Sequence, residues 1–256
     1  MSDIVTFHDL KDKSVFITGG GSGIGASLTE GFLQQGAKVA FVQRSDASGF
    51  AAKMGSKYGS TPVFIQCDIT DIPALKEAMA QAASVNGAFD VVVNNAANDN
   101  RHQLADITPE SWDMGQAVNL RPHVFTAQAA VEGMKDAGGG SIINFSSVSY
   151  MMGNGDYPGY VAAKAAITGL TRGLARELGP HNIRVNALMP GWVLTERQME
   201  LWATPEGLAA HLEKQCLKEH LVADDIVDAT LFLASKASRM MTGQALVVDG
   251  GVVVTG

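Results

Sequence analysis

Short apolar runs recur along the whole chain, and longer segments with helical spacing separate them. Seven runs are rich in Val, Ile and Phe and are continuously apolar, without the alternation of a half-exposed strand. A strand covered on both faces gives this pattern, because neither face meets water. The expected strands are residues 15–18, 39–42, 63–65, 89–93, 141–145, 183–188 and 245–248.

Five of the intervening segments repeat apolar residues at helical spacing. They are residues 23–35, 72–85, 123–135, 159–178 and 225–234. Regular alternation of strands and helices predicts an α/β fold: a doubly wound parallel sheet with helices on both faces, forming a single domain over residues 1–256. A barrel is the rival architecture, but it needs eight strand–helix units and tends to carry its phosphate loops late in the chain. Residues 196–218 are polar and helical without a strand of their own, which favours a lid over the site.

Composition narrows the class of protein. With 46% hydrophobic and 18% charged residues among 256, the chain is too apolar to be disordered. No run approaches the ~18 apolar residues of a membrane span. Residues 1–4 lack the basic and apolar parts of a signal peptide, so we expect a cytoplasmic protein. The net charge of −7 argues against nucleic-acid binding.

Cysteine and histidine give no sign of a metal site. Cys67 and Cys216 are the two cysteines, too few for a structural zinc site or a disulfide framework, and both are expected to be buried and reduced. The six histidines show no metal-ligand spacing. His102 is the one expected at the mouth of the site.

A glycine-rich loop follows the first expected strand and opens the first expected helix. Residues 18–25 read Thr-Gly-Gly-Gly-Ser-Gly-Ile-Gly. Glycines let the backbone approach a pyrophosphate closely, and the N–H groups at the start of the helix attract its charge. The loop lacks the Gly-Lys-Ser/Thr of a P-loop, which argues against ATP or GTP hydrolysis. Its position between strand and helix favours a dinucleotide site over a plain turn.

One tyrosine of the four has a lysine four residues further on. Tyr160 and Lys164 are expected on one helix, and positions i and i+4 share a face. A nearby ammonium favours the phenolate and lowers a pKa that is ordinarily ~10. Such a phenol can serve as a general base near neutral pH, although the spacing alone does not exclude a surface pair.

The chain resembles the short-chain dehydrogenase/reductase family, whose motifs it carries in family order along its whole length. The glycine loop, Asp68, the Asn94-Asn95-Ala96-Ala97 segment, Asn119, Ser147, Tyr160, Lys164 and Pro190-Gly191 carry this resemblance. Ala97 departs from the family's usual Gly, and Ala is tolerated there unless φ is positive.

The resemblance implies an NAD(P)-dependent dehydrogenase on a Rossmann fold. Tyr160 would take the hydroxyl proton as hydride leaves, Ser147 would hold the same oxygen, and Lys164 would also hold the nicotinamide ribose. Asn119 would support a water that relays protons from Lys164. The implied cofactor-binding residues are Gly19, Ser22, Gly23, Ile24, Gly25, Gln43, Arg44, Asp68, Ile69, Asn95, Ala96, Ala97, Tyr160, Lys164, Pro190, Gly191, Val193 and Thr195. For Asp68 and Thr195, a helix-capping role stands beside the cofactor role.

The segments at residues 94–102 and 190–198 resemble those of bacterial aldose 1-dehydrogenases of the D-xylose and D-galactose type. A pyranose site needs buried donors and acceptors, which discriminate better than apolar walls. The expected substrate residues are Asn98, Asp99, Arg101, His102, Ser147, Asn154, Tyr160 and Trp192. The expected reaction is oxidation of the anomeric hydroxyl to a lactone. A 3-oxoacyl thioester or ketone reductase remains the alternative, and a non-enzymatic dinucleotide sensor is disfavoured by the intact Ser147, Tyr160 and Lys164.

The end of the second expected strand bears on the choice between NAD and NADP. NAD sites usually place an acid there to bind the ribose 2′-hydroxyl, and this chain has Gln43 instead. Arg44 can pair with a 2′-phosphate, and Asp46 lies too far into the next turn. We expect both cofactors to work, with a slight preference for NADP. The family resemblance also implies a homotetramer.

Overall fold

Seven parallel strands form one sheet in the computed structural model, which describes residues 5–254. The strand order is β3-β2-β1-β4-β5-β6-β7. The strands are β1 (Ser14–Thr18), β2 (Lys38–Gln43), β3 (Val63–Gln66), β4 (Val91–Asn94), β5 (Gly140–Phe145), β6 (Ile183–Pro190) and β7 (Ala245–Val248). The predicted doubly wound α/β fold is confirmed. Residues 1–4, on which the signal-peptide expectation rested, lie outside the described residues.

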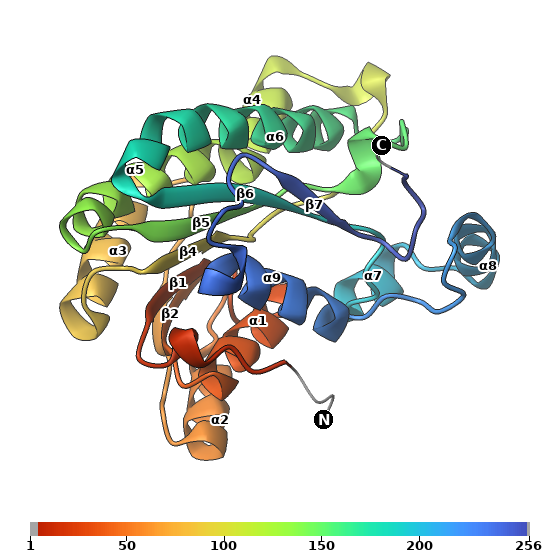
Figure 1. Ribbon diagram of the computed structural model, residues 1–256. Coiled ribbons are helices and arrows are strands. Elements are labelled where there is room, and N and C mark those ends of the chain that lie inside the picture. The colour runs from red at the N-terminus through yellow and green to blue at the C-terminus, as the bar shows by residue number, and fades with distance from the viewer. Residues whose placement is uncertain (1–4, 255–256) are drawn as a thin grey trace.

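Helices cover both faces of this sheet (Figure 1). The α-helices are α1 (Gly23–Gln34), α2 (Ser48–Tyr58), α3 (Ile72–Asn86), α4 (Pro109–Asn119), α5 (Arg121–Asp136), α6 (Pro158–Leu178), α7 (Glu196–Leu201), α8 (Pro205–Lys214) and α9 (Val227–Ala234). Short 3₁₀ turns are η1 (His8–Leu10), η2 (Leu104–Asp106), η3 (Val148–Tyr150), η4 (Gly179–His181), η5 (Ala223–Ile226) and η6 (Lys236–Ser238). Helices α1, α2 and α9 lie on one face, and α3, α5 and α6 lie on the other.

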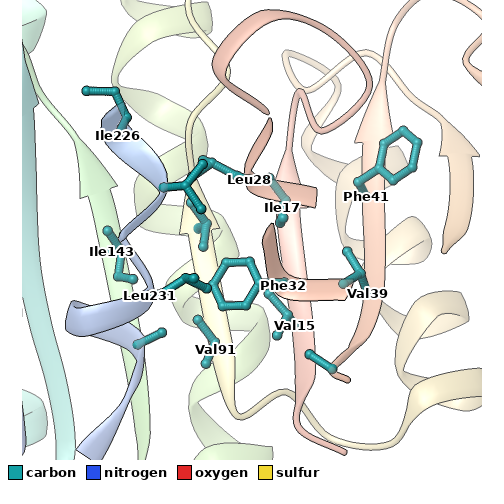
Figure 2. Close-up of a cluster of buried hydrophobic side chains, with 14 of the residues drawn as sticks. Val15, Ile17, Leu28, Phe32, Val39, Phe41, Val91, Ile143, Ile226 and Leu231 are labelled. Carbon is teal, nitrogen blue, oxygen red and sulfur yellow. The ribbon is translucent and has the colours of Figure 1, made fainter. Parts of the chain in front are cut away.

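Alternate residues of each strand feed two separate cores. In β1, Val15 and Ile17 pack against α1, where Leu28 and Phe32 are fully buried (Figure 2). Phe16 points to the opposite face, into the cluster formed with α3, α5 and α6. Because both faces are buried, the strands are continuously apolar, which is the pattern seen in the sequence.

Most expected elements form close to their predicted ends, with two kinds of difference. Strand β4 begins at Val91 rather than at residue 89, and the last expected helix divides into η5 and α9. Helices α2 and α4 were missed. Each buries only two residues, Ala51 and Met54 in α2 and Ala117 and Asn119 in α4, so neither carries an apolar stripe.

The cysteine prediction is half wrong. Cys67 is buried, whereas Cys216 is exposed and its thiol donates to the carbonyl of Gly251 at 3.1 Å. None of the helices in residues 5–254 is both long and apolar enough to cross a membrane.

The order of the strands determines where a ligand can bind. The chain passes from β1 to β2 and β3 on one side, and then returns to β4 on the other side of β1. In a doubly wound sheet the crevice at such a reversal, beyond the carboxyl ends of the strands, is the usual binding site. The glycine loop after β1 and the Asn95 segment after β4 both lie at this point.

Candidate active site

A cleft of about 1810 Å³ lies along this edge of the sheet. Sites for a single small molecule usually have ~300–1,000 Å³, so this one has room for a dinucleotide and a substrate together. The predicted residues that line it are Gly19, Ser22, Gly23, Ile24, Gly25, Gln43, Arg44, Asp68, Ile69, Asn95, Ala96, Ala97, Asn98, Asp99, Arg101, Ser147, Asn154, Tyr160, Lys164, Pro190, Gly191, Trp192, Val193 and Thr195. Asn119 and His102 do not line it.

The glycine loop has the shape that a pyrophosphate requires. Gly19 has φ +70°, in the left-handed region, and its N–H donates to the Val42 carbonyl at 2.7 Å. A Cβ on Gly25 would lie 1.9 Å from the Gly19 carbonyl oxygen, so the first turn of α1 can approach the loop only without a side chain. Ser22 caps this helix with its backbone and makes no side-chain cap, which leaves the first-turn N–H groups for a ligand. The residues present therefore fit a dinucleotide.

The loops after β1 and β4 are bonded to each other. The Thr18 hydroxyl accepts from the backbone N–H groups of Asn95 (3.0 Å) and Ala96 (3.1 Å). The Asn95 side-chain amide donates back to the Thr18 carbonyl at 3.0 Å. Ala97 is absent from the described non-glycine residues with positive φ, so alanine is unstrained where the family usually has glycine.

The end of β2 holds an amide and an arginine but no carboxylate in the cleft. Gln43 accepts from the Gly21 N–H at 3.0 Å and so supports the glycine loop. Arg44 lines the cleft. The Asp46 carboxylate accepts from the Ser48 N–H (2.9 Å) and hydroxyl (3.0 Å) and is not part of the cleft wall.

Asp68 and Ile69 line the same end of the cleft. One Asp68 oxygen accepts from the Thr70 N–H at 2.9 Å and the Thr70 hydroxyl at 2.8 Å. The backbone hydrogen bond, with help from the charge of Arg44, lowers the pKa of Asp68. Asp71 caps α3 by accepting from the Ala74 N–H at 3.0 Å, so Asp68 does not have the helix-capping role considered for it.

Ser147, Tyr160 and Lys164 meet on the wall beside the Asn95 loop. Ser147 follows β5 and begins η3, where its hydroxyl accepts from the Ser149 N–H at 3.1 Å. Tyr160 and Lys164 lie one turn apart in α6, with the Lys164 ammonium 5.4 Å from the centre of the Tyr160 ring. Lys164 is 1% exposed and donates to the Phe145 carbonyl at 2.7 Å.

The electrostatics differ from the sequence expectation. Burial raises the pKa of Tyr160, the negative charge of Asp99 raises it further, and a hydrogen bond with the Ser147 side chain lowers it. Lys164 is not among the groups that lower it. Instead burial lowers the pKa of Lys164 itself to about 7, so the lysine carries only part of a charge at neutral pH. The effect of Lys164 on this phenol therefore stays a prediction, and the shifts in the pKa of Tyr160 come from other groups.

Asn119 holds the loop rather than the cleft. It is 2% exposed at the end of α4. Its side-chain oxygen accepts from the Asn98 N–H at 2.8 Å, and its nitrogen donates to the carbonyls of Asn98 (3.0 Å) and Gly115 (3.1 Å). The expected support of a water is not what these side-chain bonds do. They fix the path of the chain that leads to Asp99.

The segment after Trp192 joins this loop through a polar network. Gln198 accepts from the Trp192 indole at 3.0 Å and donates to the Asp99 carboxylate at 2.7 Å. Arg197 lies 3.7 Å from the other Asp99 oxygen and donates to the Asn100 side chain at 2.6 Å. Helices α7 and α8 make up most of the segment expected to be a lid. This network and the cleft lining place them along the cleft.

Thr195 begins α7, and its hydroxyl accepts from the Gln198 N–H at 3.3 Å. The capping role considered for it is therefore present. Its methyl group lies so near Gly23 that a Cβ there would be 3.2 Å away. Thr195 thus faces the glycine loop across the cleft.

His102 is a structural residue and not part of the cleft wall. One ring nitrogen lies 3.0 Å from the Asn100 carbonyl, and the other accepts from the Gly159 N–H at 3.3 Å. The ring therefore links the loop to the start of α6. Both nitrogens are already engaged, so the structure gives no support for the predicted substrate contact of His102.

Several cleft residues were missed by the sequence reasoning. Gln198, Arg197 and Trp202 lie within the expected lid, but nothing in their spacing singles them out. Tyr157 stands three residues before Tyr160, a helical spacing that could have marked it.

Comparison with known proteins agrees with this geometry. A family model described as enoyl-(acyl carrier protein) reductase matches residues 19–253. The chain is 50% identical to a probable galactose dehydrogenase, GalD, of Rhizobium meliloti over 248 residues, which are 96% of this chain and 97% of that protein. It is 47% identical to a D-xylose 1-dehydrogenase of Caulobacter vibrioides, over 96% of this chain and 97% of that one.

Solved structures show the same fold at lower identity. A putative short-chain alcohol dehydrogenase from Sinorhizobium meliloti superposes with a TM-score of 0.91 at 33% identity, covering 96% of this chain and 98% of that one. A blue fluorescent protein from a metagenomic library, in complex with NADPH, gives a TM-score of 0.88 at 32% identity, covering 96% and 100%. The chain belongs to the short-chain dehydrogenase/reductase family of NAD(P)-dependent oxidoreductases.

Proposed function

We propose that this protein oxidises the anomeric hydroxyl of a free aldopyranose to the lactone, with NAD or NADP as the hydride acceptor. The names of the two relatives at 50% and 47% identity support an aldose as substrate. Galactose, xylose, arabinose and fucose are the candidates.

The polar wall above the catalytic phenol carries this proposal. Asp99 lines the cleft, and its charge acts on both Tyr160 and Lys164. The carboxylate is oriented by Gln198, which also holds the Trp192 indole. A carboxylate accepts hydrogen bonds from hydroxyl groups, and a fixed acceptor of this kind rejects substrates that lack them.

Three side chains share the chemical work. Tyr160 accepts the proton of the C1 hydroxyl, Ser147 holds the same oxygen by hydrogen bond, and Lys164 positions the ribose beside them. A bound dinucleotide would supply a positively charged nicotinamide ring as the acceptor for the C1 hydrogen and its electron pair. One C–H and one O–H bond are thereby exchanged for the carbonyl of the lactone.

The two cofactors are both expected to work, with a slight preference for NADP. No carboxylate of the cleft wall lies at the end of β2, and Arg44 lines the cleft where a 2′-phosphate would bind. We expect Arg44→Ala to weaken NADP more than NAD, because its guanidinium pairs only with the phosphate. Ratios of kcat/KM for NAD and NADP in both proteins measure this. A hundredfold preference for NAD that Arg44→Ala leaves unchanged would contradict it.

A screen of aldoses tests the substrate. Purified protein is given each sugar with NAD and with NADP in separate reactions, and the absorbance of the reduced cofactor is followed. Tyr160→Phe is the control for oxidation that does not use the cleft. If no common aldose reacts while acetoacetyl thioesters are rapidly reduced with NADPH, the protein is a 3-oxoacyl thioester reductase and the proposal is wrong.

A further inference from the structure

Three side chains from the 97–103 loop and α6 form a stacked column that ends at the catalytic phenol. The Arg101 guanidinium lies over the ring of Tyr157, 3.7 Å from its centre. The Tyr157 ring stacks on that of Tyr160, with centres 5.2 Å apart and planes inclined by 13°. Tyr157 is buried, and nothing in the proposed reaction uses it.

Hydrogen bonds on both sides hold the column in place. The Asn154 amide donates to the Tyr157 hydroxyl at 3.2 Å, which fixes the plane of that ring. The residue after Arg101 is bound by its backbone, since the His102 N–H donates to the Asp156 carbonyl at 2.7 Å. Asp156 has φ +66°, and its side chain accepts from Gln103 at 2.7 Å. Arg101 therefore projects from a loop that is bonded to the segment just before α6.

An aromatic side chain of the lid region also lies near Arg101. The Trp202 ring centre is 5.2 Å from the guanidinium, so the cation lies close to two aromatic rings. A guanidinium stacks well on aromatic faces and keeps its charge there. Packing of this kind holds a positive charge at a fixed place beside the Tyr157–Tyr160 pair.

The charges around Tyr160 act in opposite directions. Asp99 raises the pKa of the phenol, Tyr157 also raises it, and Arg101 lowers it. Lys164 lies on the same helix face. The other charged or titratable side chains at this end of the cleft are Asp156, Glu196, Arg197, Glu200, His211 and Lys214. Arg197 is paired with Asp99.

We propose that Arg101 and Tyr157 are positioning residues for Tyr160: Tyr157 fixes the plane of the phenol, and Arg101 supplies the positive charge that favours its ionised form during oxidation. The inference rests on the proposed function, in which Tyr160 is the general base.

The pH dependence of kcat for sugar oxidation, at saturating sugar and cofactor, tests it. Arg101→Met removes the charge, so the midpoint of the rise in kcat should move up by about half to one pH unit. At pH 7 this costs about three- to tenfold in kcat, which is recovered at high pH. Arg101→Lys keeps a charge and should shift the midpoint by less. Asp99→Asn should move the midpoint to lower pH. General damage to the site would not shift the midpoint in opposite directions in the Arg101 and Asp99 variants.

Two further variants separate the column from simple folding defects. Tyr157→Leu removes the stacked ring that fixes the plane of the phenol and should lower the maximum kcat. Arg176→Met removes an exposed charge from the far end of α6 and serves as the matched control. A sugar deuterated at C1 shows, by its isotope effect, the pH range in which hydride transfer limits kcat.

The result that overturns the inference is an unchanged midpoint in Arg101→Met, or a midpoint that Arg101→Lys moves as far as Arg101→Met does. Failure of the proposed function looks different, because the wild-type protein would then oxidise no aldose. In that case the same comparison is made on whichever alcohol the protein does oxidise.

Discussion

In the proposed function the chemistry of the cleft depends on Tyr160, because its phenol is the proposed proton acceptor beside Ser147. Replacing it by Phe removes the acceptor and keeps the ring that packs on Tyr157. We expect turnover to fall by ~100-fold or more, the size of a general-base contribution, while cofactor affinity is retained. Steady-state rates and cofactor titration by fluorescence measure the two effects. Near-normal turnover would remove Tyr160 from its assigned role.

Lys164 should show a different combination of effects. Its ammonium is buried, and burial lowers its pKa to about 7. Lys164→Met removes the group proposed to hold the ribose, so both turnover and cofactor affinity should fall. The change in stability should be small, because Met does not have to be desolvated as a charge but leaves the Phe145 carbonyl without its donor. Kinetics, cofactor titration and thermal unfolding at pH 7 together test this, and unchanged cofactor affinity would contradict the ribose contact.

Individual residues differ in how far the sequence could place them. Tyr160 and Lys164 are set by one helical spacing, so their juxtaposition followed from the chain alone. Asn119 and His102 lie near the site in sequence, yet hydrogen bonds to Asn98 and Gly159 use up their polar atoms. These hydrogen-bond partners come from other segments of the chain, and no local sequence pattern predicts them.

At the scale of elements, α7 is attached to the 97–103 loop through Gln198 and Arg197. Gln198→Leu removes the donor to Asp99 and the acceptor for the Trp192 indole. Hydrogen bonds to a charged group contribute about 1.5–3 kcal/mol, so KM for the sugar should rise by about tenfold or more. The dissociation constant of the cofactor is the internal control, because Gln198→Leu keeps the backbone N–H that donates to Thr195. Equal losses for sugar and cofactor would mean that α7 does not act on the sugar alone.

Elements were predictable in proportion to how much apolar surface they bury. The five inner strands are largely buried, the edge strands β3 and β7 are partly buried, and the sequence showed all seven as apolar runs. Helix α4 has a mostly polar sequence, and its start depends on a cap in which Thr108 accepts from the Ser111 N–H at 3.2 Å. A helix held by caps and by one or two buried residues leaves little periodic signal.

At the scale of the whole molecule, the cleft results from strand order rather than from any one segment. The glycine loop after β1 and the Asn95 loop after β4 are 70 or more residues apart, and they meet because β1 pairs with β4. The alternation of elements identified the architecture, and the reversal point then located the site. The pKa values of Tyr160 and Lys164 could not be foreseen, because burial depends on the completed cleft.

One buried histidine links the core behind the site to the stability of the whole fold. His123 begins α5 and is 1% exposed. Burial, with the nearby charge of Lys164, lowers its pKa from 6.5 to about 3. Below pH 6.5 the unfolded chain therefore takes up a proton that the folded protein refuses, and stability falls as the pH falls toward 3. Above pH 6.5 the ring is neutral in both states and contributes no pH dependence.

The size of this effect follows from the one proton that the unfolded chain binds and the folded protein does not. A difference of one bound proton changes the free energy of unfolding by about 1.36 kcal/mol per pH unit, so wild-type protein should lose about 1–2 kcal/mol between pH 6.5 and pH 5 through His123. His123→Gln cannot take up that proton. Its free energy of unfolding should therefore fall less than that of the wild type, by about this amount. Denaturant unfolding at several pH values measures the difference, with His8→Gln, a change at an exposed histidine, as the matched control. Carboxylates titrate mainly at lower pH, so they contribute little to the difference between pH 6.5 and pH 5. An equal loss of unfolding free energy in the wild type and His123→Gln would therefore show that His123 does not set the acid sensitivity.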